Sequence, residues 1–300
     1  MTTSPHRKPH LDALAVTLLV ICCLFWGWQQ VLVKATLPFI PPVMQVALRF
    51  ALATLVLLAW CKLRGIPIFN RDGLAKEGVW VGVLFALEFI CLYVGLQFTT
   101  ASRLTVFLYT SPFFVALVLP RFVSSERLKP LQWLGLACAF VAVVFAMSGN
   151  RGATNQTWLG DLLALGAGMF WGLTTVVIRA TRLSSIRAEK LLFYQLAISA
   201  VCLLPASLFM GENWRITLTT MTSFAWASLA IQTIIGAFAS YLAWMWMLGR
   251  YPATQLSSFT FLTPVFTLIF GAWWLGEPVT ASLVAALVLV GVGIVLVNRK

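Results

Sequence analysis

Two charged side chains lie deep inside apolar runs of this sequence, Arg49 in one run and Glu88 near the middle of the next. A charge in hydrocarbon costs several kcal/mol unless it is paired or hydrated. If the two runs are antiparallel helices, the residues differ in depth by about 6 Å at 1.5 Å per residue, which their side chains can bridge. The sequence therefore predicts an Arg49–Glu88 ion pair. Two other roles for Glu88 stay open: it could couple to a proton, or contact the ammonium or carboxylate of a bound molecule.

The other residues with acid, base or ligand chemistry do not form a catalytic set. Both histidines, His6 and His10, fall in the N-terminal tail. The six cysteines show neither a CxxC pair nor the spacing of metal ligands. An enzyme working inside a membrane would need a nucleophile with a base, or a metal, at depth. The sequence thus predicts that the chain is not an enzyme and has no metal and no cofactor.

Polar and aromatic side chains share one helical face in two separate segments. The two sets are Trp26, Gln29 and Gln30, and, 145 residues later, Trp171, Thr174 and Thr175. Amides and hydroxyls are costly in hydrocarbon unless satisfied, so both faces are expected to line a wet cavity or to contact protein. Hydrogen bonding between helices is the alternative use of such residues.

Both faces belong to a signature that occurs twice. Phe25-Trp26-Gly27 precedes Lys34 by seven residues, and Phe170-Trp171-Gly172 precedes Arg179 by the same distance. A sequence that repeats at half its length predicts two related halves. Lys34 and Arg179 are candidate gate or mouth residues of a cavity between those halves. Snorkelling of both side chains to the lipid head groups is the alternative.

A second pair of faces matches at an offset of 152 residues. Each combines a hydroxyl, an aromatic ring and a proline: Thr105, Tyr109 and Pro112, then Ser257, Phe261 and Pro264. A proline inside a helix removes a backbone donor, kinks the helix and leaves the carbonyl four residues earlier without its partner. That carbonyl could accept from a bound ammonium or from the hydroxyl residue before the proline, or the proline could be only a structural kink.

The composition excludes a soluble globular domain. The chain is 60% hydrophobic and 10% charged, with a mean hydropathy of +0.91. Its net charge of +12 would suit nucleic acid in a soluble protein, but the basic residues are scattered between apolar runs, so no nucleic-acid partner is expected. About 20 apolar residues cross a bilayer. The sequence therefore predicts an all-α polytopic membrane protein with ten spans, near 13–34, 43–61, 79–98, 102–120, 130–148, 159–179, 189–209, 224–248, 253–275 and 279–297.

The basic residues also predict the topology. Sixteen Lys and Arg residues fall in one set of alternate connectors and four in the other, so both termini are expected to be cytoplasmic. Five spans per half is an odd number, which inverts one half relative to the other. The expected organisation is a cytoplasmic tail at 1–12, a five-helix repeat at 13–150 and a second, inverted five-helix repeat at 151–300.

Together these features resemble the drug/metabolite transporter superfamily, EamA type, over essentially the whole chain. The resemblance rests on Phe-Trp-Gly with a downstream base, on Ala-Ser or Ala-Thr before each hydroxyl-proline segment, and on Glu126 and Glu277 after those segments. Within the superfamily the chain is most similar to YddG-type exporters of aromatic and other neutral amino acids from bacterial inner membranes. The resemblance implies a ten-helix basket with a central cavity lined by spans one to four and six to nine. It also implies that spans five and ten pack together at the side.

The leading hypothesis is a secondary carrier that exports small amphipathic metabolites, above all aromatic and other neutral amino acids, by alternating access. A drug or other metabolite exporter of the same superfamily is the alternative. A channel would need a continuous polar lining or rings of charge, whereas the polar residues here cluster near mid-span. The expected partners are a small-molecule substrate and the lipid bilayer. Energy coupling, direction and self-association stay open.

Overall fold

The computed structural model describes residues 11–70, 73–122, 130–148, 156–251, 256, 259–260 and 262–298. Over these residues the chain is helical, with short connections and no strand. The first half contains α1 (Ala13–Thr36), α2 (Pro42–Leu63), α3 (Ala75–Gly95), α4 (Ala101–Leu108), α5 (Ser111–Val118), the 3-10 turn η1 (Leu119–Arg121) and α6 (Pro130–Ser148). The second half contains α7 (Thr157–Ala180), η3 (Arg182–Ser185), α8 (Ala188–Phe209), α9 (Trp214–Thr220), α10 (Ser223–Ile231), the π-helix η4 (Gln232–Ser240), α11 (Tyr241–Arg250), α13 (Leu262–Leu275) and α14 (Ala281–Asn298).

Many of these helices are suited to a bilayer. Within the described residues, seven helical stretches are long and apolar enough to cross a membrane: Ala13–Thr36, Pro42–Leu63, Ala75–Gly95, Ala101–Arg121, Thr157–Ala180, Ala188–Phe209 and Ser223–Met247. Two shorter apolar helices follow, at Leu262–Leu275 and Ala281–Gly293. The all-helical membrane class is therefore as predicted, and the count of ten spans stays a prediction.

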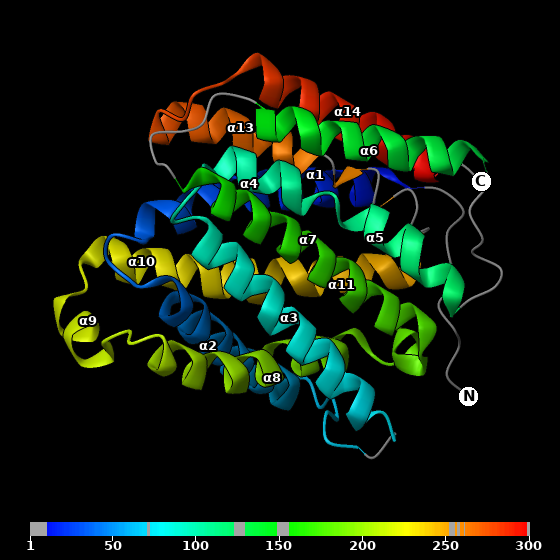
Figure 1. The fold of residues 1–300 in the computed structure, drawn as a ribbon. Coiled ribbons are helices and arrows are strands. Elements are labelled where there is room, and N and C mark those ends of the chain that lie inside the picture. The colour runs from blue at the N-terminus through cyan, green and yellow to red at the C-terminus, as the bar shows by residue number, and fades with distance from the viewer. Residues whose placement is uncertain are drawn as a thin grey trace.

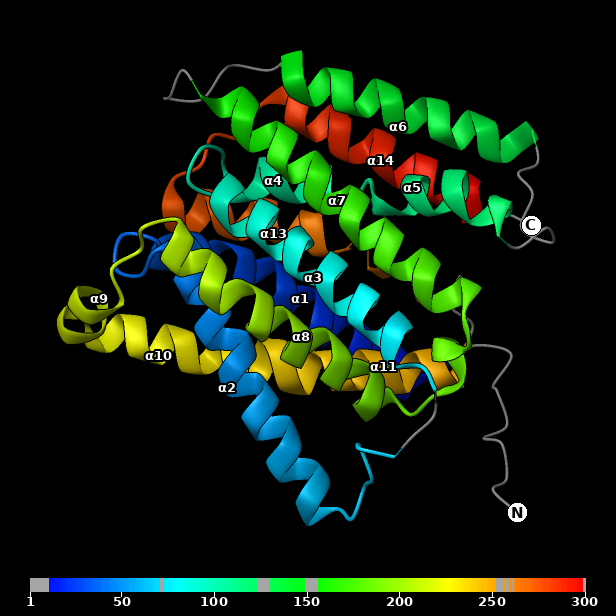
Figure 2. The same cartoon turned by 60° about the horizontal axis from the view of Figure 1, so that its bottom comes forward.

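Contacts between the two halves dominate the packing. Helix α1 packs on α13, α2 on α8, and α3 on both α7 and α8. Helices α6 and α14 lie side by side along one edge of the bundle (Figures 1 and 2). A Cβ atom on Gly293 of α14 would lie 2.9 Å from the carbonyl oxygen of Gly135 in α6, so only a glycine allows this approach. The contact expected between spans five and ten is thus present within the chain.

Each of the two repeated prolines lies in the first turn of a helix. Pro112 follows a break at Tyr109–Thr110, where α4 ends and α5 begins. Pro264 lies in the first turn of α13. Proline fits these positions because the first backbone N–H groups of a helix have no intrahelical acceptor. The expected kink in the first half is therefore a break with a new helix start.

Each Phe-Trp-Gly glycine lies at a tight crossing with one of these proline-containing segments. A Cβ atom on Gly27 of α1 would lie 2.9 Å from the carbonyl oxygen of Thr263, and one on Gly172 of α7 would lie 2.9 Å from that of Ser111. The two glycines are 145 residues apart and their two partners 152, the offsets that relate the repeats in the sequence. The same backbone contact is thus made twice, once with α1 and once with α7.

Gly172→Ala is expected to lower the stability of the protein by about 1–3 kcal/mol, because the new methyl group must push α7 away from the backbone of α5. The matched control is Gly166→Ala on the same helix, where the methyl group would meet the Cys91 sulfur at an ordinary 3.6 Å. Alanine also favours helix, so the control should melt at or above the wild-type temperature. Melting of the purified protein in detergent measures both, and equal melting temperatures for the two variants would contradict the tight crossing.

Candidate functional site

A cavity of about 1310 Å³ lies between the two halves. Its wall takes residues from α1, α2, α3, α4, α5, η1, α7, η3, α8, η4, α11 and the start of α13. Small-molecule sites are typically concave, mostly apolar and fitted with a few polar groups, and this cavity has that character. It is the candidate site of the molecule.

Most of the residues predicted from the sequence border this cavity. They are Trp26, Gln29, Gln30, Arg49, Glu88, Tyr109, Pro112, Trp171, Thr174, Thr175 and Arg179. Thr105, Lys34 and Pro264 are not part of its wall. For Thr105 this corrects the prediction: its hydroxyl donates to the carbonyl oxygen of Ala101 at 2.7 Å, so α4 itself satisfies the side chain. Ser257 and Phe261 lie outside the described residues.

The two repeated tryptophans meet aromatic rings from the opposite half. Trp26 lies edge-on to Tyr241, with ring centroids 6.4 Å apart, and its indole nitrogen donates to the Ser240 hydroxyl at 2.8 Å. Trp171 lies edge-on to Tyr109 at 5.4 Å. Edge-to-face pairs at these distances stabilise the ring positions. The cavity therefore contains aromatic surfaces held in place by both halves.

Arg49 is fully buried among neutral partners. Its Nη1 donates to the Tyr93 hydroxyl at 2.8 Å, and its Nη2 lies 3.4 Å from Gln29 Oε1 and 3.5 Å from the Tyr241 hydroxyl. The guanidinium carbon lies 5.5 Å from the centroid of the Phe89 ring. Its Nε has no hydrogen-bond partner. No carboxylate of the described chain comes within 4.0 Å of this guanidinium.

The predicted Arg49–Glu88 ion pair is therefore wrong. Glu88 is only 5% exposed, borders the same cavity, and has no partner for Oε2. Arg49 instead reaches the face of α3 that presents Phe89 and Tyr93. Residue 88 is rotated by about 100° from residue 89 around a helix with 3.6 residues per turn. A depth difference that their side chains could bridge was therefore not enough to make the two residues a pair.

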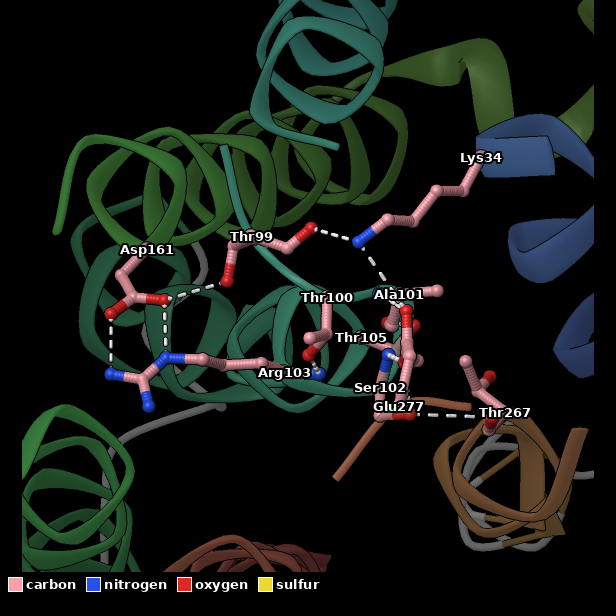
Figure 3. Close-up of polar contacts among 10 residues, drawn as sticks. All are labelled: Lys34, Thr99, Thr100, Ala101, Ser102, Arg103, Thr105, Asp161, Thr267 and Glu277. Carbon is pink, nitrogen blue, oxygen red and sulfur yellow. Dashed lines mark hydrogen bonds and ion pairs between the residues drawn. The ribbon is translucent and has the colours of Figure 1, made fainter. Parts of the chain in front are cut away.

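At one end of the bundle, Lys34 belongs to a closed polar network rather than to a free mouth. Its ammonium donates to the Thr99 carbonyl oxygen at 2.5 Å and lies 3.4 Å from Glu277 Oε1 (Figure 3). The Glu277 carboxylate also accepts from the backbone N–H groups of Ala101 and Ser102, at 2.7 and 3.0 Å. These are the first N–H groups of α4, where a negative charge is favourable.

A second ion pair adjoins the first. Arg103 Nε and Nη2 donate to the two oxygens of Asp161 at 2.7 and 2.6 Å, and the Thr99 hydroxyl donates to Asp161 Oδ1 at 3.2 Å (Figure 3). We call Lys34, Thr99, Arg103, Asp161 and Glu277 the charged network. It joins α1, α4, α7 and the segment between α13 and α14. This network was not predicted from the sequence, although Asp161 near the start of an apolar span is a signal that a partner is needed.

The cavity reaches the opposite end of the bundle. None of the charged-network residues borders it. Basic residues near helix ends do: Arg64, Arg179, Arg187 and Arg250. We call this the basic end. Arg179, the predicted counterpart of Lys34, thus lies on the cavity wall, whereas Lys34 lies in the closed network.

Comparison with known proteins agrees with this architecture. The EamA-like transporter family matches residues 13–148 and again 158–299. An uncharacterized transporter of Archaeoglobus fulgidus is 28% identical, over 91% of each chain. A protein of Salmonella typhimurium named a probable amino-acid metabolite efflux pump is 25% identical, over 92% of each chain. A solved crystal structure shares the fold with a TM-score of 0.67 at 17% identity, over 96% of this chain and 98% of its own.

The family match covers nearly the whole chain in two consecutive copies, one in each half. The relatives named as transporters match over most of their length as well. The chain belongs to the EamA-like transporter family.

Proposed function

We propose that this protein is a secondary carrier that exports small amphipathic metabolites, foremost aromatic and other neutral amino acids, by alternating access. The cavity is the observation that supports this most. It combines aromatic rings, amides and two buried ionisable side chains, Arg49 and Glu88, and it reaches the basic end but not the charged network. Relatives named probable amino-acid metabolite efflux pumps, from Salmonella typhimurium and Escherichia coli, favour the same substrate class.

We further propose ten spans in two inverted five-helix repeats. The separate family match of each half and the duplicated glycine crossings support the repeat. With five spans in each half, the halves have opposite orientations, as in many secondary transporters that bind substrate near the midplane. We propose that the basic end and both termini lie in the cytoplasm of a bacterial cell and that the protein lies in the inner membrane, because Lys and Arg residues concentrate in the connectors of one side.

In this orientation the structure is a state open to the cytoplasm. An exporter loads its substrate in that state, and Arg179 lies at the mouth through which substrate enters. Rocking of one half against the other would separate the charged network on the outside and close the basic end. Because the network joins α1 and α4 of the first half to α7 and the α13–α14 segment of the second, it acts as the outer gate.

The size of the cavity favours a second candidate, an exporter of drugs or other bulky metabolites. A volume of about 1310 Å³ exceeds the roughly 300–1000 Å³ of common small-molecule sites. The same gating would serve such a substrate, so the two candidates differ only in what the cavity binds.

Counterflow in proteoliposomes loaded with phenylalanine, threonine or a cationic dye tests the substrate class. The proposal predicts saturable amino-acid exchange that Trp26→Ala and Trp171→Ala each weaken about fivefold to tenfold, because a contact between the substrate ring and an aromatic side chain of the cavity wall is worth about 1 to 1.4 kcal/mol. Movement of the dye without amino-acid exchange would favour the drug exporter instead.

Two tryptophans serve as matched controls for this experiment. Trp28 lies two residues from Trp26 on α1 and stacks on Trp274, and Trp158 lies on α7 with 59% of its surface exposed. Neither borders the cavity. Trp28→Ala and Trp158→Ala should therefore retain exchange, and an equal loss in all four variants would contradict a role for Trp26 and Trp171 in binding.

Glu277→Gln is expected to open the outer gate more often. It removes the charge that holds Lys34 and the start of α4, and losing about 1.5 kcal/mol of charged hydrogen bonding shifts a two-state population about tenfold. The reporter is Gln30→Cys, on the cavity wall, in a chain from which the six native cysteines have been removed. The rate at which an impermeant maleimide added outside labels this cysteine measures how often the outer gate opens.

The control for the gate is Glu212→Gln. Glu212 also accepts from the first N–H groups of a helix, those of Val43 and Met44 in α2 at 3.0 and 2.6 Å, but it is not part of the charged network. Faster labelling in Glu277→Gln alone supports the gate. Labelling rates that match the wild type in Glu277→Gln, or that rise equally in both variants, would contradict it.

A further inference from the structure

The cavity holds two ionisable side chains of opposite type, Arg49 and Glu88, that do not pair with each other. Arg49 is fully buried and Glu88 is 5% exposed, and both border the cavity. Within the described residues, neither has an oppositely charged group within 4.0 Å. Each also leaves one polar atom without a hydrogen-bond partner, Nε of Arg49 and Oε2 of Glu88. A buried charge with no counter-charge is strongly destabilising, so a ligand that supplies both counter-charges would bind here with advantage.

The guanidinium of Arg49 leaves its carboxylate-binding edge weakly occupied. Nε has no partner. Nη2 lies 3.5 Å from the Tyr241 hydroxyl, and in its hydrogen-bonding orientation the Gln29 amide oxygen accepts from Nη1 and Nη2 at 3.2 Å each, so the partners of this edge are neutral and its contacts are longer than those of a carboxylate. The fully engaged arginine of this chain shows what that edge can do: Arg103 uses Nε and Nη2 to hold the two oxygens of Asp161 at 2.7 and 2.6 Å. A carboxylate that displaced the weak neutral contacts of Arg49 would gain the same paired geometry.

Glu88 offers the complementary end. Arginine stays charged under all conditions that a cell meets, so Arg49 always needs an anion. A carboxylate accepts hydrogen bonds readily from an ammonium, which has three N–H donors. The unpartnered hydroxyl of Thr174 also borders the cavity and supplies a further acceptor there.

We infer that Arg49 binds the carboxylate and Glu88 the ammonium of a zwitterionic amino acid in this cavity. The inference rests on the proposed amino-acid export and adds the chemistry by which the substrate is chosen. The missing Arg49–Glu88 ion pair then has a function, because the substrate takes the place of each residue's partner. A molecule that lacks either charged group leaves one of the two residues uncompensated.

Three probes that share a phenyl ring separate the two ends: phenylalanine, phenethylamine without the carboxylate, and 3-phenylpropionate without the ammonium. Their competition against labelled phenylalanine exchange is measured for wild type, Arg49→Gln and Glu88→Gln. Wild type should prefer phenylalanine to either truncated probe about tenfold to a hundredfold, the range for a charged hydrogen-bonded contact. Arg49→Gln should abolish the preference over phenethylamine only, and Glu88→Gln the preference over 3-phenylpropionate only.

Two further variants and a melting measurement guard against misfolding. Lys62→Gln removes an exposed cation from α2, the helix of Arg49, at a position that does not border the cavity, and should keep the wild-type preferences. Arg49→Lys keeps the charge but loses the planar guanidinium that can bind a carboxylate through two N–H groups. It should therefore lose part of the preference for phenylalanine over phenethylamine. Without substrate, Arg49→Gln should melt no lower than wild type, because it removes an uncompensated buried charge.

The results that would overturn the inference differ from those that would overturn the proposed function. If wild type exchanges phenylalanine and Arg49→Gln weakens phenylalanine and phenethylamine by the same factor, Arg49 is structural and the inference fails while amino-acid export stands. If Glu88→Gln keeps every preference and only loses a pH dependence of exchange, Glu88 carries a proton and its half of the inference fails. If wild type moves a cationic dye but no phenylalanine, amino-acid export itself fails.

Discussion

The pairing of Lys34 with Glu277 and of Arg103 with Asp161 determines which end of the bundle is closed. These side chains come from both halves of the chain, and the Arg103, Asp161 and Glu277 side chains are nearly removed from water. Charged hydrogen bonds in such surroundings are strong and specific when every group has its partner. The end that holds the network is therefore the tightly fixed one, and the cavity reaches the other end.

Close backbone packing gives the two halves one common geometry. Gly27 and Gly172 each allow their helix to touch the backbone of a proline-containing segment, at Thr263 and Ser111. Side chains one residue before these glycines, Trp26 and Trp171, then point into the space between the halves. The motif thus combines a packing residue with a cavity residue, so any movement of the crossing also moves the wall of the cavity.

The sequence could predict the helices, the repeat and the cavity-facing stripes because helical periodicity is local. Trp26 and Trp171 border the cavity for this reason. The ion pair of Arg49 with Glu88 is wrong because depth in a membrane fixes the level of a residue and not its rotation about the helix. The role of Glu277 could not be predicted, since the backbone groups that it binds lie 175 and 176 residues earlier in the chain. That contact depends on how the two halves pack.

The proposed amino-acid binding requires that the substrate carboxylate lies against Arg49 between the two halves. Solid-state NMR can measure this directly, with phenylalanine carrying ¹³C in its carboxyl group and protein carrying ¹⁵N in its arginine side chains. Subtracting the spectrum of Arg49→Gln isolates the contribution of Arg49. Binding at Arg49 predicts dipolar dephasing for a distance of about 4 Å or less between the carboxyl carbon of phenylalanine and a guanidinium nitrogen of Arg49. The carboxylate oxygens would then lie about 2.8 Å from that nitrogen, as in other charged N–H···O contacts. Dephasing that is absent at saturating phenylalanine, or unchanged in Arg49→Gln, would contradict it.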